Sequence, residues 1–112
     1  RAPAPGWATS ARVSAASLNA GQRETVTVSV RSNTALSALV DIEIYDPSGA
    51  KVFQTYYDNR SFGGGVAQSF AQSWRVPTNA KKGTYRVMVG VFSPGWGTLY
   101  AWNSAAVSFT VK

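Results

Sequence analysis

Short segments in which apolar and polar residues alternate recur along the chain, separated by turn-forming residues. The clearest is 23–32, where Val26, Val28 and Val30 alternate with threonine, serine and arginine. A period of two is typical of β-strands with one buried face, and no segment of the sequence shows a convincing helical period. Because a short strand with one apolar face needs a second sheet to cover it, this alternation predicts two packed β-sheets.

Turn signals divide the alternating segments. The sequence Asp46-Pro-Ser-Gly49 has proline and glycine at the second and fourth positions of a turn, which predicts a hairpin. About seven short strands, with turns at roughly 8–12-residue spacing, predict an all-β, antiparallel two-sheet sandwich of immunoglobulin or fibronectin-III type. Gly83-Thr-Tyr85 resembles the tyrosine corner of such folds. The side chains expected in the core are Val40, Ile42, Ile44, Val52, Phe62, Phe70, Trp74, Val76, Tyr85, Val87, Val89, Val91, Val107, Phe109 and Val111.

The length of 112 residues suits one domain. The opening segment Arg1–Gly6 is rich in proline and alanine, as linkers often are. We therefore interpret residues 1–7 as a linker remnant and residues 8–112 as one module of a longer, secreted, extracellular polypeptide. Only 14% of the residues are charged, against about 25% in an average soluble domain. This composition is common in secreted proteins that face polysaccharides.

Residue types that carry most enzyme chemistry are missing. The chain has no histidine and no cysteine, so the commonest general base and the thiolate nucleophile are both excluded. Asp41 and Glu43 share one face of a predicted strand, about 7 Å apart. That spacing suits a pair of glycosidase carboxyls, but it also arises on any solvated strand. We expect no catalysis.

No cofactor is expected either. Asp46 and the Asp58-Asn59 pair offer oxygen ligands that would suit a structural calcium ion. However, Asp46 opens a turn sequence, in which an aspartate usually accepts hydrogen bonds from its own backbone. No apolar run reaches the roughly 20 residues of a membrane span, so no membrane partner is expected.

The net charge of +6 raises the question of nucleic-acid binding. The basic residues are scattered, and Lys81-Lys82 is their only adjacent pair. A surface that tracks phosphates usually shows clustered lysine and arginine. We therefore expect a dispersed, solubilising charge and no nucleic-acid partner, with single-stranded nucleic acid kept as a testable alternative.

The segment 93–103 is the strongest candidate for a binding site. It places Trp96, Tyr100 and Trp102 beside one proline and two glycines, which mark a surface loop. A soluble protein seldom exposes such rings without using them for binding, and a sugar ring has a flat face of C–H groups that suits them. If Tyr100 and Trp102 are locally extended, they project to one side, about 7 Å apart. Alternatively, the loop folds back and plugs one end of the sandwich.

Polar groups near these rings are expected to bind sugar hydroxyls. Asn103 offers an amide, and Asp58, Asn59 and Arg60 occupy a second predicted loop. Whichever of Tyr56 and Tyr57 faces outward would extend the aromatic strip, and Tyr57 is taken as the candidate. Trp7 either covers an end of the sandwich or joins the binding face. The candidate carbohydrate-binding residues are thus Trp96, Tyr100, Trp102, Asn103, Tyr57, Asp58 and Arg60.

The segments 18–21, 40–49, 74–77, 83–85 and 91–103 together resemble a known group of proteins. The resemblance is to the small β-sandwich modules attached to secreted bacterial glycoside hydrolases, and in particular to carbohydrate-binding module family 81, which is attached to an endoglucanase. It implies non-catalytic binding of β-1,4-linked and mixed-linkage glucans, which would target a covalently linked hydrolase to plant cell-wall polysaccharide. Only the aromatic segment carries over at the level of residues.

A second function class fits the same residues. An immunoglobulin-like spacer domain that packs on a catalytic neighbour would use the aromatic segment as an interdomain interface. Binding of the isolated module to polysaccharide separates the two hypotheses.

Overall fold

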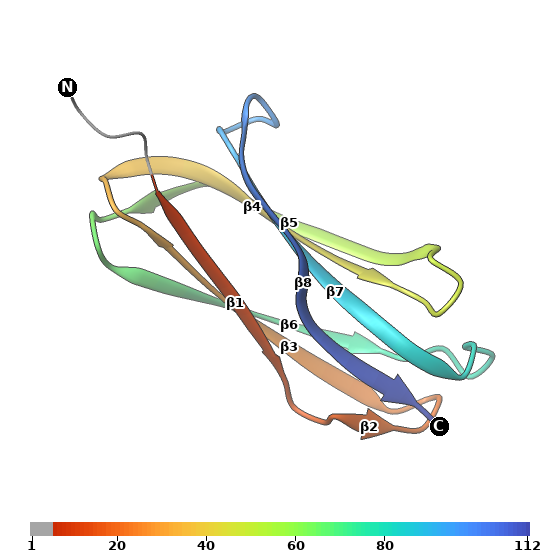
Figure 1. Ribbon diagram of the computed structural model, residues 1–112. Helices are drawn as coiled ribbons and strands as arrows, with labels where there is room; N and C mark the ends of the chain where they lie inside the picture. Colours follow the sequence, from red (N-terminus) through yellow and green to blue (C-terminus); the bar gives the residue numbers. More distant parts are fainter. Residues whose placement is uncertain (1–5) are drawn as a thin grey trace.

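The computed structural model describes residues 6–112, which form eight β-strands in two packed sheets (Figure 1). The smaller sheet has three antiparallel strands in the order β1-β3-β6. The larger sheet has five strands in the order β2-β8-β7-β4-β5, all antiparallel except that β2 runs parallel to β8. The strands are β1 (Trp7–Val13), β2 (Ser17–Leu18), β3 (Arg23–Ser32), β4 (Leu36–Tyr45), β5 (Lys51–Phe62), β6 (Ala67–Arg75), β7 (Gly83–Phe92) and β8 (Leu99–Val111).

This architecture confirms the predicted all-β, immunoglobulin-like sandwich. It has one strand more than the seven expected, since the two-residue strand β2 gives no alternation to detect. Residues 1–5 of the predicted linker lie outside the described residues. Trp7, which the prediction placed in the linker, is the first residue of β1 and lies opposite Ser32 of β3.

The core lies between the sheets and follows the predicted alternation. It includes an interior aromatic cluster of Trp74, Tyr85 and Phe109, whose ring centroids lie 5.4–6.2 Å apart. The Tyr85 hydroxyl donates a hydrogen bond to the Lys81 carbonyl oxygen at 2.7 Å, which confirms the predicted tyrosine corner. This bond ties the start of β7 to the loop that precedes it.

Val52 is a wrong core prediction, because its side chain is exposed. The register shifts between Ile44 and Tyr45 of β4, which pair with Phe53 and Lys51 respectively, so Val52 has no partner. This bulge turns Phe53 inward, where its ring centroid lies 6.2 Å from that of Trp74.

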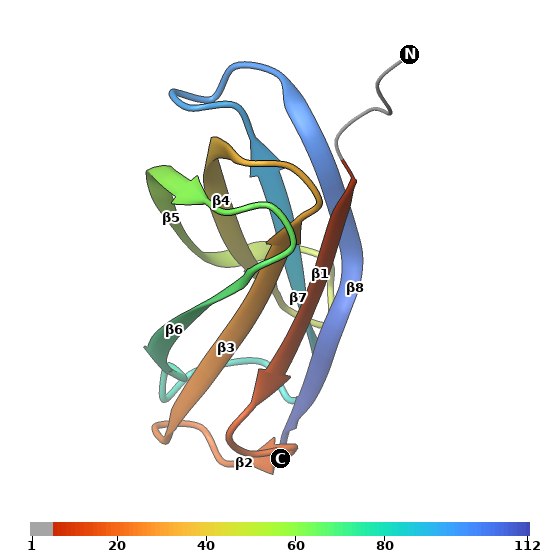
Figure 2. The same cartoon turned by 90° about the vertical axis from the view of Figure 1, so that its left-hand side faces the viewer.

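The β7–β8 loop leans over the ends of β4 and β5, which is clearest in Figure 2. A hydrogen bond fixes it there, because the backbone N–H of Gly95 donates to Asp58 Oδ1 on β5 at 3.0 Å. Within the loop, Ser93 Oγ accepts from the Thr98 N–H at 2.6 Å. The β7–β8 loop is therefore attached to β5, the strand at one edge of the larger sheet.

Candidate functional site

One row of four residues crosses the outer face of the larger sheet. Trp102 of β8 lies opposite Gly90 of β7, Gly90 lies opposite Asp41 of β4, and Asp41 lies opposite Tyr56 of β5. Residues directly opposite each other in a sheet point to the same side. The row therefore places Trp102 and Tyr56 on one face, separated by three strand spacings, or about 14 Å.

Gly90 gives the Trp102 indole its position. A Cβ atom at Gly90 would lie 2.8 Å from Cζ3 of Trp102 and 2.9 Å from a ring carbon of Phe92, which is closer than real Cβ atoms come. Only glycine therefore lets these two rings lie directly over the strand. The Trp102 side chain is 43% exposed, so this indole has strand β7 below it and solvent on its other side.

Trp96 completes this surface from the β7–β8 loop. Its side chain is 41% exposed, and its ring centroid lies 5.0 Å from that of Phe92 and 5.1 Å from that of Tyr56. Its φ of 61° is left-handed, a conformation that costs a non-glycine residue about 1–2 kcal/mol. We name Trp102, Phe92, Trp96 and Tyr56 the aromatic shelf. The loop holds Trp96 on this shelf in spite of the backbone cost.

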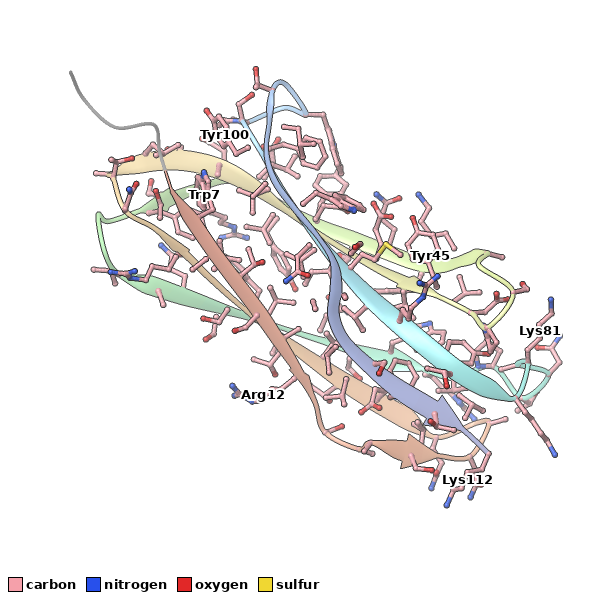
Figure 3. All side chains as sticks on the ribbon, viewed as in Figure 1. Trp7, Arg12, Tyr45, Lys81, Tyr100 and Lys112 are labelled. Carbon is pink, nitrogen blue, oxygen red and sulfur yellow. The ribbon has the colours of Figure 1, made fainter. Side chains whose placement is uncertain are left out.

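Tyr100 does not join the shelf, so the prediction that it projects with Trp102 is wrong. Ala101 pairs with Val91 and Leu99 pairs with Phe92, which leaves Tyr100 as an unpaired bulge residue. Its ring stacks instead on Trp7, with centroids 5.7 Å apart and an interplanar angle of 14° (Figure 3). Trp7 in turn packs edge-on against Phe62 of the core at 5.4 Å. The pair thus covers one end of the sandwich, which settles the alternative left open for Trp7.

Tyr56, and not Tyr57, is the outward-facing tyrosine. Tyr57 lies opposite Val40 and faces the core, where its ring centroid is 4.9 Å from that of Phe70. Its hydroxyl lies 3.2 Å from Gln72 Oε1 of β6, which links the two sheets at their open edge. The guanidinium of Arg60 lies 5.6 Å from the centre of the Tyr57 ring, on the same side of β5. Neither Tyr57 nor Arg60 contributes to the shelf.

The other predicted polar residues hold the scaffold together. Asp58 and Asn59 lie in strand β5, not in a loop, and form a second bulge opposite Leu39. Asp58 Oδ1 accepts the loop N–H described above, so this carboxylate positions the shelf. The amide of Asn103 donates to Thr9 Oγ1 at 3.1 Å and accepts from the Ala105 N–H at 3.1 Å, which ties β8 to β1.

A polar group that was not predicted from the sequence lies beside the shelf. Gln54 Nε2 donates to Asp41 Oδ1 at 3.0 Å and to Glu43 Oε2 at 3.3 Å, and Lys51 Nζ donates to Gln54 Oε1 at 3.0 Å. The Tyr45 hydroxyl donates to Glu43 Oε1. We name Asp41, Glu43, Gln54 and Lys51 the polar row. Two acids at alternate positions of an otherwise apolar strand were the only signal for it in the sequence.

Asp41 and Glu43 were predicted to be solvated, but they are covered by their neighbours. Asp41 is fully buried and Glu43 is 6% exposed. Burial, and then a hydrogen bond with Glu43, raise the pKa of Asp41 to about 7. Burial opposes ionisation of Glu43, yet hydrogen bonds from Asp41 and Tyr45 lower the pKa of Glu43. The two carboxyls therefore share one proton in mildly acidic solution.

A metal site is not assembled within residues 6–112, because no three acidic side chains lie close enough together to hold an ion. Asp46 accepts hydrogen bonds from the Ser48 and Ala50 N–H groups at 2.9 and 3.0 Å, as the turn sequence predicts. Its pKa is lowered mainly by the Ser48 hydroxyl. In the same range, no helix is long and apolar enough to cross a membrane.

No protein-family model and no curated protein matches the chain. Solved structures share its fold. The C-terminal domain of wzt has a TM-score of 0.71 at 16% identity, over 93% of this chain and 70% of that chain. The CARDB domain of the PF1109 protein from Pyrococcus furiosus, solved with di-metal ions, has a TM-score of 0.61 at 15% identity. The match covers 96% of this chain and 89% of that chain. A β-glucosidase from Erythrobacter marinus matches at a TM-score of 0.59 and 15% identity, over 97% of this chain and 15% of that one. At these identities the likeness shows the β-sandwich fold alone.

Proposed function

We propose that this chain is a non-catalytic carbohydrate-binding module that holds a β-glucan chain on the outer face of its larger sheet. The observation that carries the proposal is the aromatic shelf. Two tryptophans more than 40% exposed, at 41% and 43%, lie on the same face as Tyr56. Burying rings of this size is worth about 1.5–3 kcal/mol each, so leaving them exposed favours a binding role.

The shelf is held by rigid elements before any ligand arrives. Trp102 and Tyr56 stand on strands, and Trp96 stands on a loop attached through the Asp58 carboxylate. Apolar faces of successive sugars would stack on these rings. Because little ordering is needed, binding loses little conformational entropy. Stacking on a partly exposed surface should give weak to moderate affinity.

Two further observations support binding without hydrolysis and a link to a hydrolase. Asp41 is fully buried and Glu43 is only 6% exposed, so this pair of carboxyls is not open to a glycosidic bond. A β-glucosidase contains a region of the same fold. We propose that the module is secreted and concentrates an attached endoglucanase on plant cell-wall polysaccharide, a gain in effective concentration.

Affinity electrophoresis of the isolated chain in soluble mixed-linkage β-glucan tests this function. We expect the glucan to retard the wild-type protein and to retard Trp102→Ala much less, with little dependence on salt. Unchanged mobility in β-glucan, xylan and mannan would overturn the proposal and favour the spacer domain. Binding that falls steeply with salt would favour single-stranded nucleic acid instead.

A further inference from the structure

The polar row lies directly beside the aromatic shelf. Gln54 stands two residues before Tyr56 on β5, and Glu43 stands two residues after Asp41 on β4, opposite Gln54. Residues two apart on a strand share a face and lie about 7 Å apart. A sugar stacked on the shelf near Tyr56 would therefore have one edge over Gln54.

Hydrogen bonds fix the Gln54 amide in one orientation. Both N–H groups of its Nε2 are used by the two carboxyls, and its Oε1 accepts from Lys51. The amide oxygen keeps one free lone pair, and the Lys51 ammonium keeps two free donors. The side chains of Gln54 and Lys51 are both exposed. An acceptor and a donor about 3 Å apart match two adjacent hydroxyl groups of a sugar.

One oxygen of the carboxyl beneath this amide accepts no hydrogen bond. Asp41 Oδ2 is buried and accepts none from an N–H or O–H group of residues 6–112. Because the pKa of Asp41 is raised to about 7, this oxygen can carry the proton that Asp41 shares with Glu43. Around it stand Glu43, Gln54 and Lys51, and Arg86 lies opposite Tyr45 on the next strand. The hydrogen bonds of this group are thus complete on the protein side except at the outward faces of Gln54 and Lys51.

We propose that Gln54 and Lys51 are specificity-determining residues that bind adjacent hydroxyls of an uncharged sugar whose ring stacks on the shelf. The inference rests on the proposed glucan-binding function. One hydroxyl donates to Gln54 Oε1, and its neighbour accepts from Lys51 Nζ. Glu43 and Asp41 act as positioning residues, because they hold the Gln54 amide through its nitrogen. The ligand class is a β-glucan with free hydroxyls along one edge.

Calorimetric titration with cellotetraose tests the assignment, with the matched variant Gln22→Ala as control because Gln22 is an exposed glutamine in the turn before β3. We expect Gln54→Ala and Lys51→Ala each to weaken binding by about three- to tenfold, as loss of one hydrogen bond does. Gln22→Ala should bind as the wild type. Circular dichroism checks that each variant is folded. If Gln54→Ala does not fold, Lys51→Ala still tests the assignment, because Lys51 is exposed.

A second ligand separates hydroxyl contacts from stacking. Methylcellulose keeps the sugar rings but lacks most hydroxyl donors. We therefore expect the wild type to bind methylcellulose more weakly than hydroxyethylcellulose. This difference in affinity between the two polymers should be smaller for Gln54→Ala. Wild-type affinity in folded Gln54→Ala and Lys51→Ala, together with lost binding in Trp102→Ala, would overturn this assignment and leave the proposed function standing. No binding of any glucan by the wild type would overturn both.

Discussion

The interior aromatic cluster and the aromatic shelf are built from the same residue types, yet they stand in opposite environments. Trp74 is 8% exposed and packs against Tyr85 and Phe109 between the sheets, whereas Trp102 is 43% exposed and lies over a glycine on the outer face. The first cluster lies between the two sheets, where the apolar faces of their strands meet. The second sits on a face with no sheet opposite it. An aromatic side chain therefore contributes to stability where it points between the sheets, and it is available for binding where it points from the outer face.

The largest difference between the two regions is expected in folding stability. Trp74→Ala should lower the free energy of unfolding by about 3–5 kcal/mol, because it leaves a cavity in the core. Trp102→Ala removes a ring that is already half in solvent and should cost far less. Urea denaturation of both variants measures this. A Trp102→Ala variant as unstable as Trp74→Ala would show that the shelf belongs to the core.

Binding should show the reverse order. Trp102→Ala is expected to weaken glucan binding by about 1–3 kcal/mol, as truncation of a binding hot spot does. Tyr100→Ala is the matched control, because its ring packs on Trp7 away from the shelf. Affinity electrophoresis compares the two variants, and equal losses would contradict the division between shelf and sandwich end.

Gly90 connects the two regions, since it is buried in strand β7 under the Trp102 ring. Gly90→Ala adds a methyl group where no space exists and is expected to cost about 1–3 kcal/mol of stability. It should also displace the indole and weaken binding. Thr84→Ala serves as the control, because Thr84 is exposed at the other end of the same strand. If folded Gly90→Ala binds glucan as well as the wild type does, the position of the Trp102 indole does not determine binding.

The pH dependence of stability should come from the outer face. Since the pKa of Asp41 is raised from 3.8 to about 7 in the folded protein, its contribution to stability is full below about pH 4 and is lost as pH rises through 7. The pKa of Glu43 is lowered in the folded protein, so its contribution to stability is lost as the pH falls through that lowered pKa. We expect the melting temperature to fall between pH 5 and pH 8 and Asp41→Asn to flatten that fall. An unchanged pH profile in Asp41→Asn would disprove the assignment.

The smallest effect is expected at the loop attachment. Asp58→Ala removes the acceptor for the Gly95 N–H and should weaken binding about threefold by loosening Trp96. Asp58→Asn keeps an acceptor oxygen and should restore most of the affinity. If both variants bind as the wild type, the Asp58 bond is not needed to hold the shelf.

The alternation of valines in β3 and β7 was enough to predict the sandwich and its core. The errors lie at bulges. Val52, Asp58 and Tyr100 each occupy or adjoin a position where one strand carries an extra residue, which reverses the facing of the side chains around it. A bulge is set by pairing with a distant strand, so the local sequence gives little sign of it. For the same reason the sequence favours Tyr57 as the outward tyrosine, although the pairing turns Tyr56 outward.

The polar row escaped prediction for a different reason. Asp41 and Glu43 were correctly placed on the outward side of β4, where an exposed strand would leave them solvated. Their burial depends on Tyr56 and Gln54 of β5 and on the residues of β7, which lie beside them only after the sheet has formed. The glycine that seats Trp102 is likewise recognisable only once the pairing of β7 with β8 is known.

The exposed indoles of the shelf are expected to contact the sugar, whereas the other tryptophans are not. The four indole N–H groups give separate signals in a ¹H–¹⁵N spectrum, so titration of the labelled protein with cellotetraose observes each ring individually. The shelf predicts that the Trp96 and Trp102 signals shift and saturate together, with Trp74 and Trp7 nearly still. Shifts confined to Trp7 or Trp74, or no shift at any indole, would contradict it.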